Sequence, residues 1–184
     1  RGQARSVANA VSLFSWENRN YAHWLIEKLA SMRWIGRARL PDDTVLLVEA
    51  GLPATVVASL ELFWPSDRIV FVERGEAVDV GRLFYFSDAA EIWEPRDGHV
   101  FDGSDYRICP EAMRWLAGTV RERVPTVAVQ TRSAYLIRPP GGNGRSVANQ
   151  EALVALLQQH GHDCIQPASL DFAAQVNYFS GLDL

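Results

Sequence analysis

The sequence predicts an α/β fold with a mostly parallel sheet, arranged as one Rossmann-like N-terminal domain followed by the beginning of a second. TVLLVEA (44–50) is a short, continuous apolar run, which is typical of a strand buried on both faces. Such strands alternate with helical segments, which favours parallel βαβ units. A second strand–loop–helix series begins where the composition changes. We therefore expect domains at 1–125 and 126–184, the second cut short.

The composition excludes several classes of protein. The chain has 184 residues, 48% of them hydrophobic, and a net charge of −4. An acidic balance argues against a nucleic-acid partner, and no apolar stretch is long enough to span a membrane. Cys109 and Cys164 have no metal-ligand spacing, so we interpret them as reduced structural thiols in a cytoplasmic protein, which could also bind peripherally to the inner membrane.

The first domain is predicted element by element. Asn20 is a good N-cap for a helix that spans 21–35, and Gly36 is its expected end. Pro53 suits the first turn of a second helix. The full prediction is strands at 10–16, 44–50, 68–74 and 82–87, helices at 21–35, 53–64 and 110–124, and a long loop at 88–110.

The second domain is predicted in the same way. We expect a strand at 131–138, a helix after Asn149 as N-cap, a strand at 163–166 and a helix capped by Ser169. The expected apolar stripes and helix ends are Leu153, Leu156 and Leu157 before Gly161, then Phe172, Val176 and Phe179 before Gly181.

NYAHWLIEKLA (20–30) contains the first candidate site. On an α-helical wheel Tyr21, Leu25 and Leu29 face the sheet, His23 and Glu27 lie opposite, and Trp24 lies on a flank. Residues i and i+4 are neighbours, so Glu27 can orient the His23 imidazole as a general base. A purely structural pair and, more weakly, a metal-dependent hydrolase are alternatives, although no third metal ligand has supporting spacing.

The loop PPGGNG is the second candidate site. Arg138 ends a predicted strand, and Arg145 and Asn149 precede a helix N-terminus, where anions are favoured. Arginine forks and glycine-rich backbone suit a diphosphate. A solvated loop with surface arginines is the alternative, and neither GxxxxGK[ST] nor GxGxxG occurs.

The tryptophans are a weaker signal. All six lie in residues 1–115, where buried tryptophan is more common than a sugar-stacking platform. Trp93, inside the predicted loop, is the candidate for stacking.

Three stretches together resemble glycosyltransferase family 61. NYAHWLIEKLA is similar to the family's N-Y-x-H-W-x-x-[DE]-x-L motif, and the segment from Arg138 through Arg145 to Asn149 is similar to its later arginine motif. GHDCIQPASLDFAAQVNYF (161–179) follows a third family pattern, with Gln175 in register.

The resemblance implies a GT-B architecture and inverting, metal-independent transfer of a sugar from a nucleotide-sugar donor to a hydroxyl of a glycan or polysaccharide, as in capsular-polysaccharide-type enzymes. It implies catalytic roles for His23 and Glu27 and donor-phosphate contacts from Arg138, Arg145 and Asn149, with no metal or other cofactor. A carboxylate from 88–110 could serve as base instead, with His23 shaping the pocket.

The sequence also departs from the family pattern. Leu29-Ala30-Ser31-Met32 stands where L-P-R-L is frequent, and Gln150 stands where glutamate is frequent. The family's H-G-A-G-L-like motif is expected beyond Leu184, so we expect an excerpt of a longer protein, with an incomplete donor site and therefore itself inactive. A non-catalytic sugar- or nucleotide-binding relic is therefore the alternative function.

Overall fold

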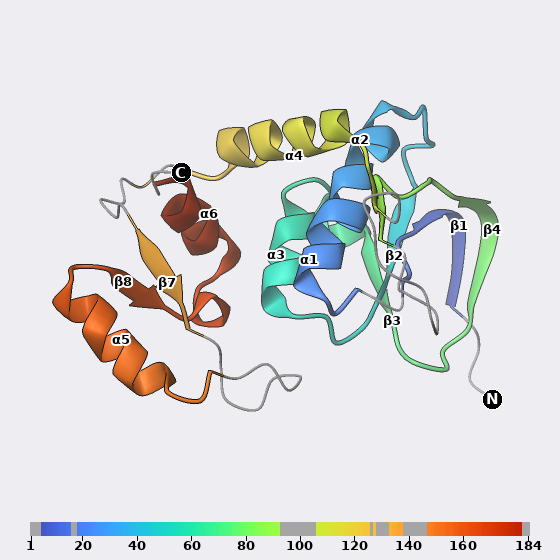
Figure 1. The fold of residues 1–184 in the computed structure, drawn as a ribbon. Helices are drawn as coiled ribbons and strands as arrows, with labels where there is room; N and C mark the ends of the chain where they lie inside the picture. The colour runs from blue at the N-terminus through green and yellow to red at the C-terminus, as the bar shows by residue number, and fades with distance from the viewer. Residues whose placement is uncertain are drawn as a thin grey trace. The chain divides into compact units, whose positions relative to one another are not determined.

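The structure is a computed structural model that describes residues 5–15, 18–92, 106–125, 127, 133–137 and 147–181. The chain forms two compact units, Arg1–Thr119 and Val120–Leu184, and the boundary falls inside helix α4 (Pro110–Arg123). Both units combine helices with parallel strands, as predicted (Figure 1).

A four-stranded, entirely parallel sheet organises the first unit. Its order is β3-β2-β1-β4, which matches the first four strands of a Rossmann fold. The strands are β1 (Arg5–Ser12), β2 (Val45–Glu49), β3 (Ile69–Val72) and β4 (Val78–Phe84). The predicted Rossmann-like parallel sheet is thus confirmed for this unit.

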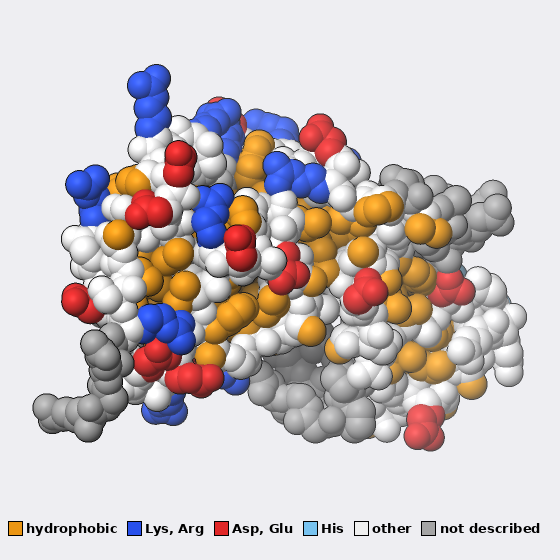
Figure 2. Space-filling view, turned by 180° about the vertical axis from the view of Figure 1, so that it is seen from behind, with side chains coloured by type: hydrophobic (Ala, Val, Ile, Leu, Met, Phe, Trp, Pro, Cys, Tyr) orange, Lys and Arg blue, Asp and Glu red, His pale blue; other side chains and the backbone are white. Residues whose placement is uncertain are grey.

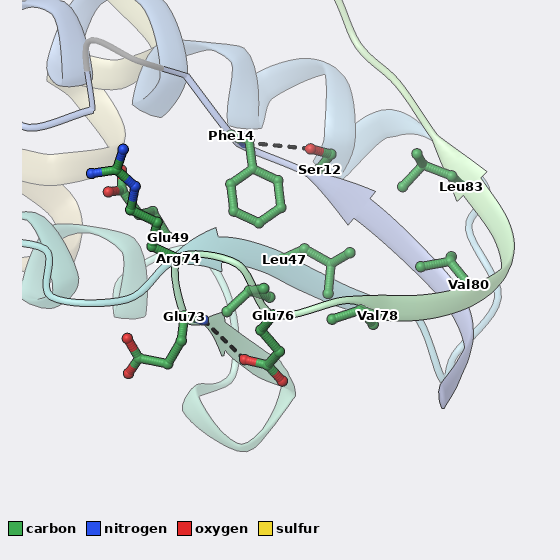
Figure 3. Close-up of a pocket in the computed structure, with 11 residues that line it drawn as sticks. Ser12, Phe14, Leu47, Glu49, Glu73, Arg74, Glu76, Val78, Val80 and Leu83 are labelled. Carbon is green, nitrogen blue, oxygen red and sulfur yellow. Dashed lines mark hydrogen bonds between the residues drawn. The ribbon is translucent and has the colours of Figure 1, made fainter. Parts of the chain in front are cut away.

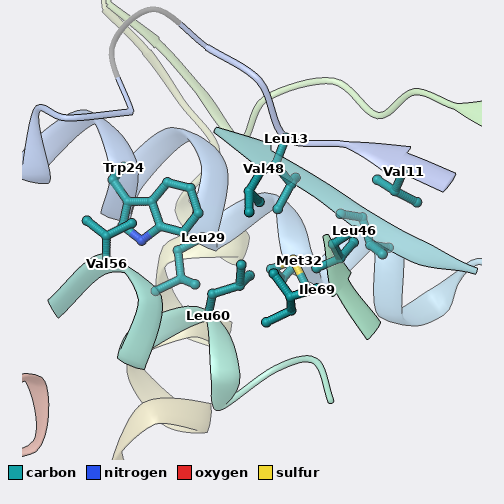
Figure 4. Packing of buried hydrophobic residues seen from close by; sticks show 11 residues of the cluster. Val11, Leu13, Trp24, Leu29, Met32, Leu46, Val48, Val56, Leu60 and Ile69 are labelled. Atoms are coloured by element: carbon teal, nitrogen blue, oxygen red, sulfur yellow. The ribbon is translucent and has the colours of Figure 1, made fainter. Parts of the chain in front are cut away.

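One face of this sheet is covered by helices. A long helix follows β1 and consists of α1 (Tyr21–His23), a π-helical turn (Trp24–Leu29) and α2 (Ala30–Arg37), and α3 (Ala54–Glu61) follows β2. Between helices and strands lies the main core, drawn in Figure 4, to which the helices contribute Trp24, Leu29, Val56 and Leu60. All four side chains are fully buried.

The opposite face carries no helix among the described residues. Leu47 and Val72 are buried there, and the valines at the start of β4 are partly buried. β3 and β4 are joined by residues 73–77 alone, whereas parallel strands are usually connected through a crossover of about a dozen residues or more. Apolar side chains are consequently visible on the surface in Figure 2.

Several predicted boundaries in the first unit are wrong. β1 spans 5–12 instead of 10–16, because its first half alternates with polar residues and pairs only with β4. The long helix continues through Gly36, whose φ is not positive, to Arg37. β4 begins at Val78 instead of 82.

The predicted loop 88–110 is also partly wrong. It carries a short antiparallel pair, β5 (Ala90–Ile92) with β6 (Tyr106–Ile108), whose strands are too short to give a periodic sequence signal. Residues 93–105, including Trp93, lie outside the described residues.

The second unit contains a βαβ arrangement. Strands β7 (Ala134–Leu136) and β8 (Asp163–Ile165) are parallel and are connected through α5 (Gln150–Gln159), after which α6 (Phe172–Ser180) follows. The predicted order of strand, helix, strand and helix is confirmed.

Two details of the second unit differ from prediction. The N-cap of α6 is Asp171, whose carboxylate accepts from Ala174 N, while Ser169 closes a 3₁₀ turn. Leu156 and Phe179 are 51% and 38% exposed, so they do not belong to buried stripes.

Candidate active site

The candidate site lies at the start of the helix that follows β1. Because the chain leaves β1 at its carboxyl end, the first turn of this helix lies at the sheet edge where α/β proteins bind ligands. The Asn20 side chain accepts from Ala22 N at 3.2 Å, which confirms the predicted cap. The loop before it is anchored by Asn18, fully buried, which donates from Nδ2 to Leu13 O at 2.8 Å.

His23 and Glu27 are in direct contact, as predicted. His23 Nδ1 lies 2.7 Å from Glu27 Oε1, and the side chains are 16% and 11% exposed. An ionised carboxylate only accepts hydrogen bonds, so the shared proton belongs on Nδ1. In the neutral imidazole Nε2 then keeps its lone pair and can accept a proton.

The π-helical turn was not predicted, and it changes which side chains are buried. Ala30 N donates to Leu25 O, five residues back. A π-bulge adds a residue to one turn, which rotates everything before it by about 100° relative to the rest of the helix. Trp24, placed on the flank by the α-helical wheel, therefore enters the core, and its indole N–H donates to Ser59 Oγ at 2.8 Å.

A segment from the end of β4 supports the same turn. Lys28 Nζ lies 2.7 Å from both carboxylate oxygens of Asp88, and the Lys28 side chain is only 9% exposed. Ala89 N donates to Glu27 O at 3.3 Å. Asp88, a carboxylate of the predicted 88–110 loop, is thus committed to an ion pair with Lys28. The pair fixes the π-helical turn and, through it, Glu27.

We expect Asp88→Asn to lower the free energy of unfolding by about 2 kcal/mol, because it leaves the buried Lys28 ammonium without its counter-charge. The matched control is Glu111→Gln, which breaks the 3.0 Å pair to Arg33 but removes a carboxylate that is 66% exposed. Its effect should stay below about 1 kcal/mol. Urea denaturation measures both, and equal effects would contradict the clamping role of Asp88.

Tyr21 makes the free energy of unfolding depend on pH in the alkaline range. Burial raises the pKa of Tyr21 from 10.0 to about 12. Between pH 10 and about 12 the folded protein keeps the Tyr21 proton that the unfolded chain loses. The contribution of Tyr21 to the free energy of unfolding should therefore be complete below pH 10 and fall as the pH rises towards about 12.

Tyr21→Phe should remove this part of the alkaline loss of stability, while Tyr85→Phe, which changes a ring that is 78% exposed, should leave it in place. Denaturant midpoints measured below and above pH 10 test this. An unchanged alkaline slope in Tyr21→Phe would show that other groups cause it.

The second candidate site is only partly described. Asn149 precedes α5 as its N-cap residue, as predicted, and its exposed side chain makes no capping hydrogen bond. Arg138 and Arg145 lie outside the described residues, so their phosphate role stays a prediction. Gln175, from the third motif, is buried and donates to Pro167 O and Leu170 O, which is a structural role.

Within the described residues, no group of three or more histidine, cysteine or acidic side chains could hold a metal ion. None of the helices in the same residues is long and apolar enough to cross a lipid bilayer.

A Rossmann-like sheet with a histidine–carboxylate pair at its carboxyl edge is an arrangement at which α/β proteins commonly bind ligands. The chain belongs to glycosyltransferase family 61: the family model Glycosyltransferase 61 matches residues 21–184. No curated protein and no solved structure gives a match. Family membership confirms the resemblance and makes sugar transfer the expected activity of this class.

Proposed function

We propose that the protein catalyses inverting transfer of a sugar from a nucleotide-sugar donor to a hydroxyl group of a glycan or polysaccharide acceptor. The observation that carries the proposal is the 2.7 Å contact between His23 and Glu27, at the sheet edge that binds ligands, in a chain of family 61. The two side chains together form a base of defined tautomer.

His23 acts as the general base. The acceptor hydroxyl gives its proton to Nε2 while its oxygen forms a bond to the anomeric carbon, and the bond from that carbon to the diphosphate breaks. The nucleoside diphosphate leaves on the opposite side, so the configuration inverts. Glu27 stabilises the imidazolium through Nδ1–H, as a carboxylate does beside a catalytic histidine.

Arg138, Arg145 and the N-terminus of α5 at Asn149 bind the leaving diphosphate. Guanidinium forks and a helix N-terminus stabilise developing negative charge on phosphate, and this role needs no metal ion. The βαβ arrangement of β7, α5 and β8 supports this assignment, because the loop before α5 follows the carboxyl end of a parallel strand. In this proposal the two units belong to a GT-B architecture.

A transfer assay tests the function. The purified protein, including any residues that its reading frame adds beyond the 184, is incubated with a panel of nucleotide sugars and hydroxyl acceptors, and NMR reports the anomeric configuration of the product. The proposal expects transfer with inversion. Product with retained configuration would contradict the mechanism, and nucleotide binding without any transfer would favour a non-catalytic binding protein.

A further inference from the structure

A hollow of about 540 Å³ lies on the face of the first unit's sheet opposite α1, α2 and α3 (Figure 3). This volume is within the range of small-ligand sites. Its floor consists of aliphatic side chains from β2, β3 and β4, including Leu47, Val72, Val80 and Leu83. Phe14, 44% exposed, stands at one side, just beyond the end of β1.

The topology explains why the hollow exists. In a doubly wound sheet a helix between β3 and β4 would cover this face, because that connection crosses to the other side of β1. Here residues 73–77 make the crossing without a helix. The strand order reverses between β1 and β4, and such switch points are where α/β sheets bind ligands.

The rim of the hollow is polar, and its three carboxylates are balanced by Arg74 together with two arginines just outside the lining. Glu49 pairs with Arg19 at 3.4 Å, and Glu76 pairs with Arg5 at 3.5 Å and also accepts from Glu73 N. Glu73 and Arg74 remain, one carboxylate and one guanidinium, and neither has an ion-pair partner within the described residues. The rim therefore offers both acceptors and donors.

These features point to a neutral, hydroxyl-rich ligand with an apolar face. A pyranose ring has such a face of C–H groups, which can lie on Phe14 and the aliphatic floor while its hydroxyls bond to the rim. A diphosphate fits poorly, because three of the four charged groups that line the hollow are carboxylates.

We infer that this hollow is a binding site for the acceptor carbohydrate, with Phe14 as the stacking platform and Glu73 and Arg74 as hydroxyl partners. The inference rests on the proposed function, because it assigns the acceptor of that reaction to a defined surface. The hollow also adjoins the loop that leads from β1 to His23, through Phe14 and the Arg19–Glu49 pair.

Methyl NMR on the 184-residue chain tests the inference without any donor. Leucine and valine methyl groups are labelled, and cellotriose, maltotriose and chitotriose are titrated in separately. We expect saturable shifts at Leu47, Val72, Val80 and Leu83 with at least one trisaccharide, and Phe14→Ala should weaken that binding at least about tenfold.

Phe71→Ala is the matched control. Phe71 is also a partly exposed phenylalanine of this sheet, at 37%, but it does not line the hollow, so its replacement should leave the affinity unchanged. Glu73→Gln and Arg74→Gln should each weaken binding several-fold. Both side chains are exposed, so the protein should stay folded in both variants.

Four results would overturn the inference. The first two are no saturable shift with any trisaccharide, and equal losses of affinity in Phe14→Ala and Phe71→Ala. The other two are methyl shifts produced by an acyl chain but by no sugar, and burial of these methyl groups in a self-associated form of the protein. Failure of the proposed function is distinguishable: sugar binding here without transfer in any assay would contradict catalysis alone, and transfer without these shifts would contradict the hollow alone.

Discussion

His23→Ala should lower kcat by about 10²- to 10⁴-fold, the range expected when a general base is removed. The KM for the nucleotide-sugar donor should change little, because the side chain acts on the acceptor hydroxyl. The helix should remain folded, since His23 is in its first turn and its side chain hydrogen-bonds, within the described part of the chain, to Glu27 alone. Initial rates over a donor and acceptor matrix measure the effect.

Glu27→Gln keeps the His23 imidazole but removes the carboxylate that orients it, so this variant tests the effect of orientation alone. An amide can donate as well as accept, so it no longer holds the proton on Nδ1 and does not stabilise an imidazolium. We expect a fall in kcat of at least about tenfold with circular dichroism unchanged.

His160→Ala is the control for loss of an imidazole, because His160 is exposed at the end of α5. Its rate should equal that of the wild type. A His23→Ala rate within about threefold of the wild type would remove His23 from the chemistry and leave the pair as a structural feature.

Trp24→Ala should lower the free energy of unfolding by about 3–5 kcal/mol, the largest effect on stability that we expect from a single substitution. The side chain has no exposed surface and packs with Val56 and Leu60 on α3. Its removal leaves a cavity between the long helix and α3 and deletes the hydrogen bond to Ser59.

Trp24→Phe and Trp34→Ala are the two comparison variants for Trp24→Ala. Phenylalanine keeps most of the volume and loses mainly the N–H···Oγ bond, so about 1–2 kcal/mol is expected. Trp34 belongs to the same helix but is only partly buried, and its replacement should also be milder than that of Trp24. If Trp24→Ala and Trp34→Ala were equally destabilising, Trp24 would not be the main contribution of this helix to the core.

Much of the architecture could be predicted because it depends on local patterns. The apolar run of β2, the cap at Asn20 and the glycine after α5 each determine an element through short-range physics. Gly161 has φ +78°, a conformation that side chains disfavour, so the sequence marks this turn directly.

The site could be predicted only in part, because its geometry depends on partners distant in sequence. The contact of His23 with Glu27 follows from spacing alone. The π-helical turn does not, because it is stabilised by Lys28 with Asp88 and by Ala89 N on Glu27 O. The available signal was Lys28, which an α-helical wheel places among the sheet-facing side chains of Tyr21, Leu25 and Leu29.

The hollow could not be predicted at all. It results from the absence of a helix between β3 and β4, which is a property of topology and not of any motif. The two short strands around residues 93–105 were missed for a related reason, since strands of three residues carry no periodicity.

The most direct test of the base formed by His23 and Glu27 is the tautomer of His23. Long-range ¹H–¹⁵N correlation spectra of the histidine rings, assigned by comparison with His23→Ala, distinguish a protonated Nδ1 from a protonated Nε2. The 2.7 Å contact predicts that the neutral ring carries its proton on Nδ1, with Nε2 unprotonated and able to accept. A neutral His23 with its proton on Nε2 would contradict the proposed role in glycosyl transfer.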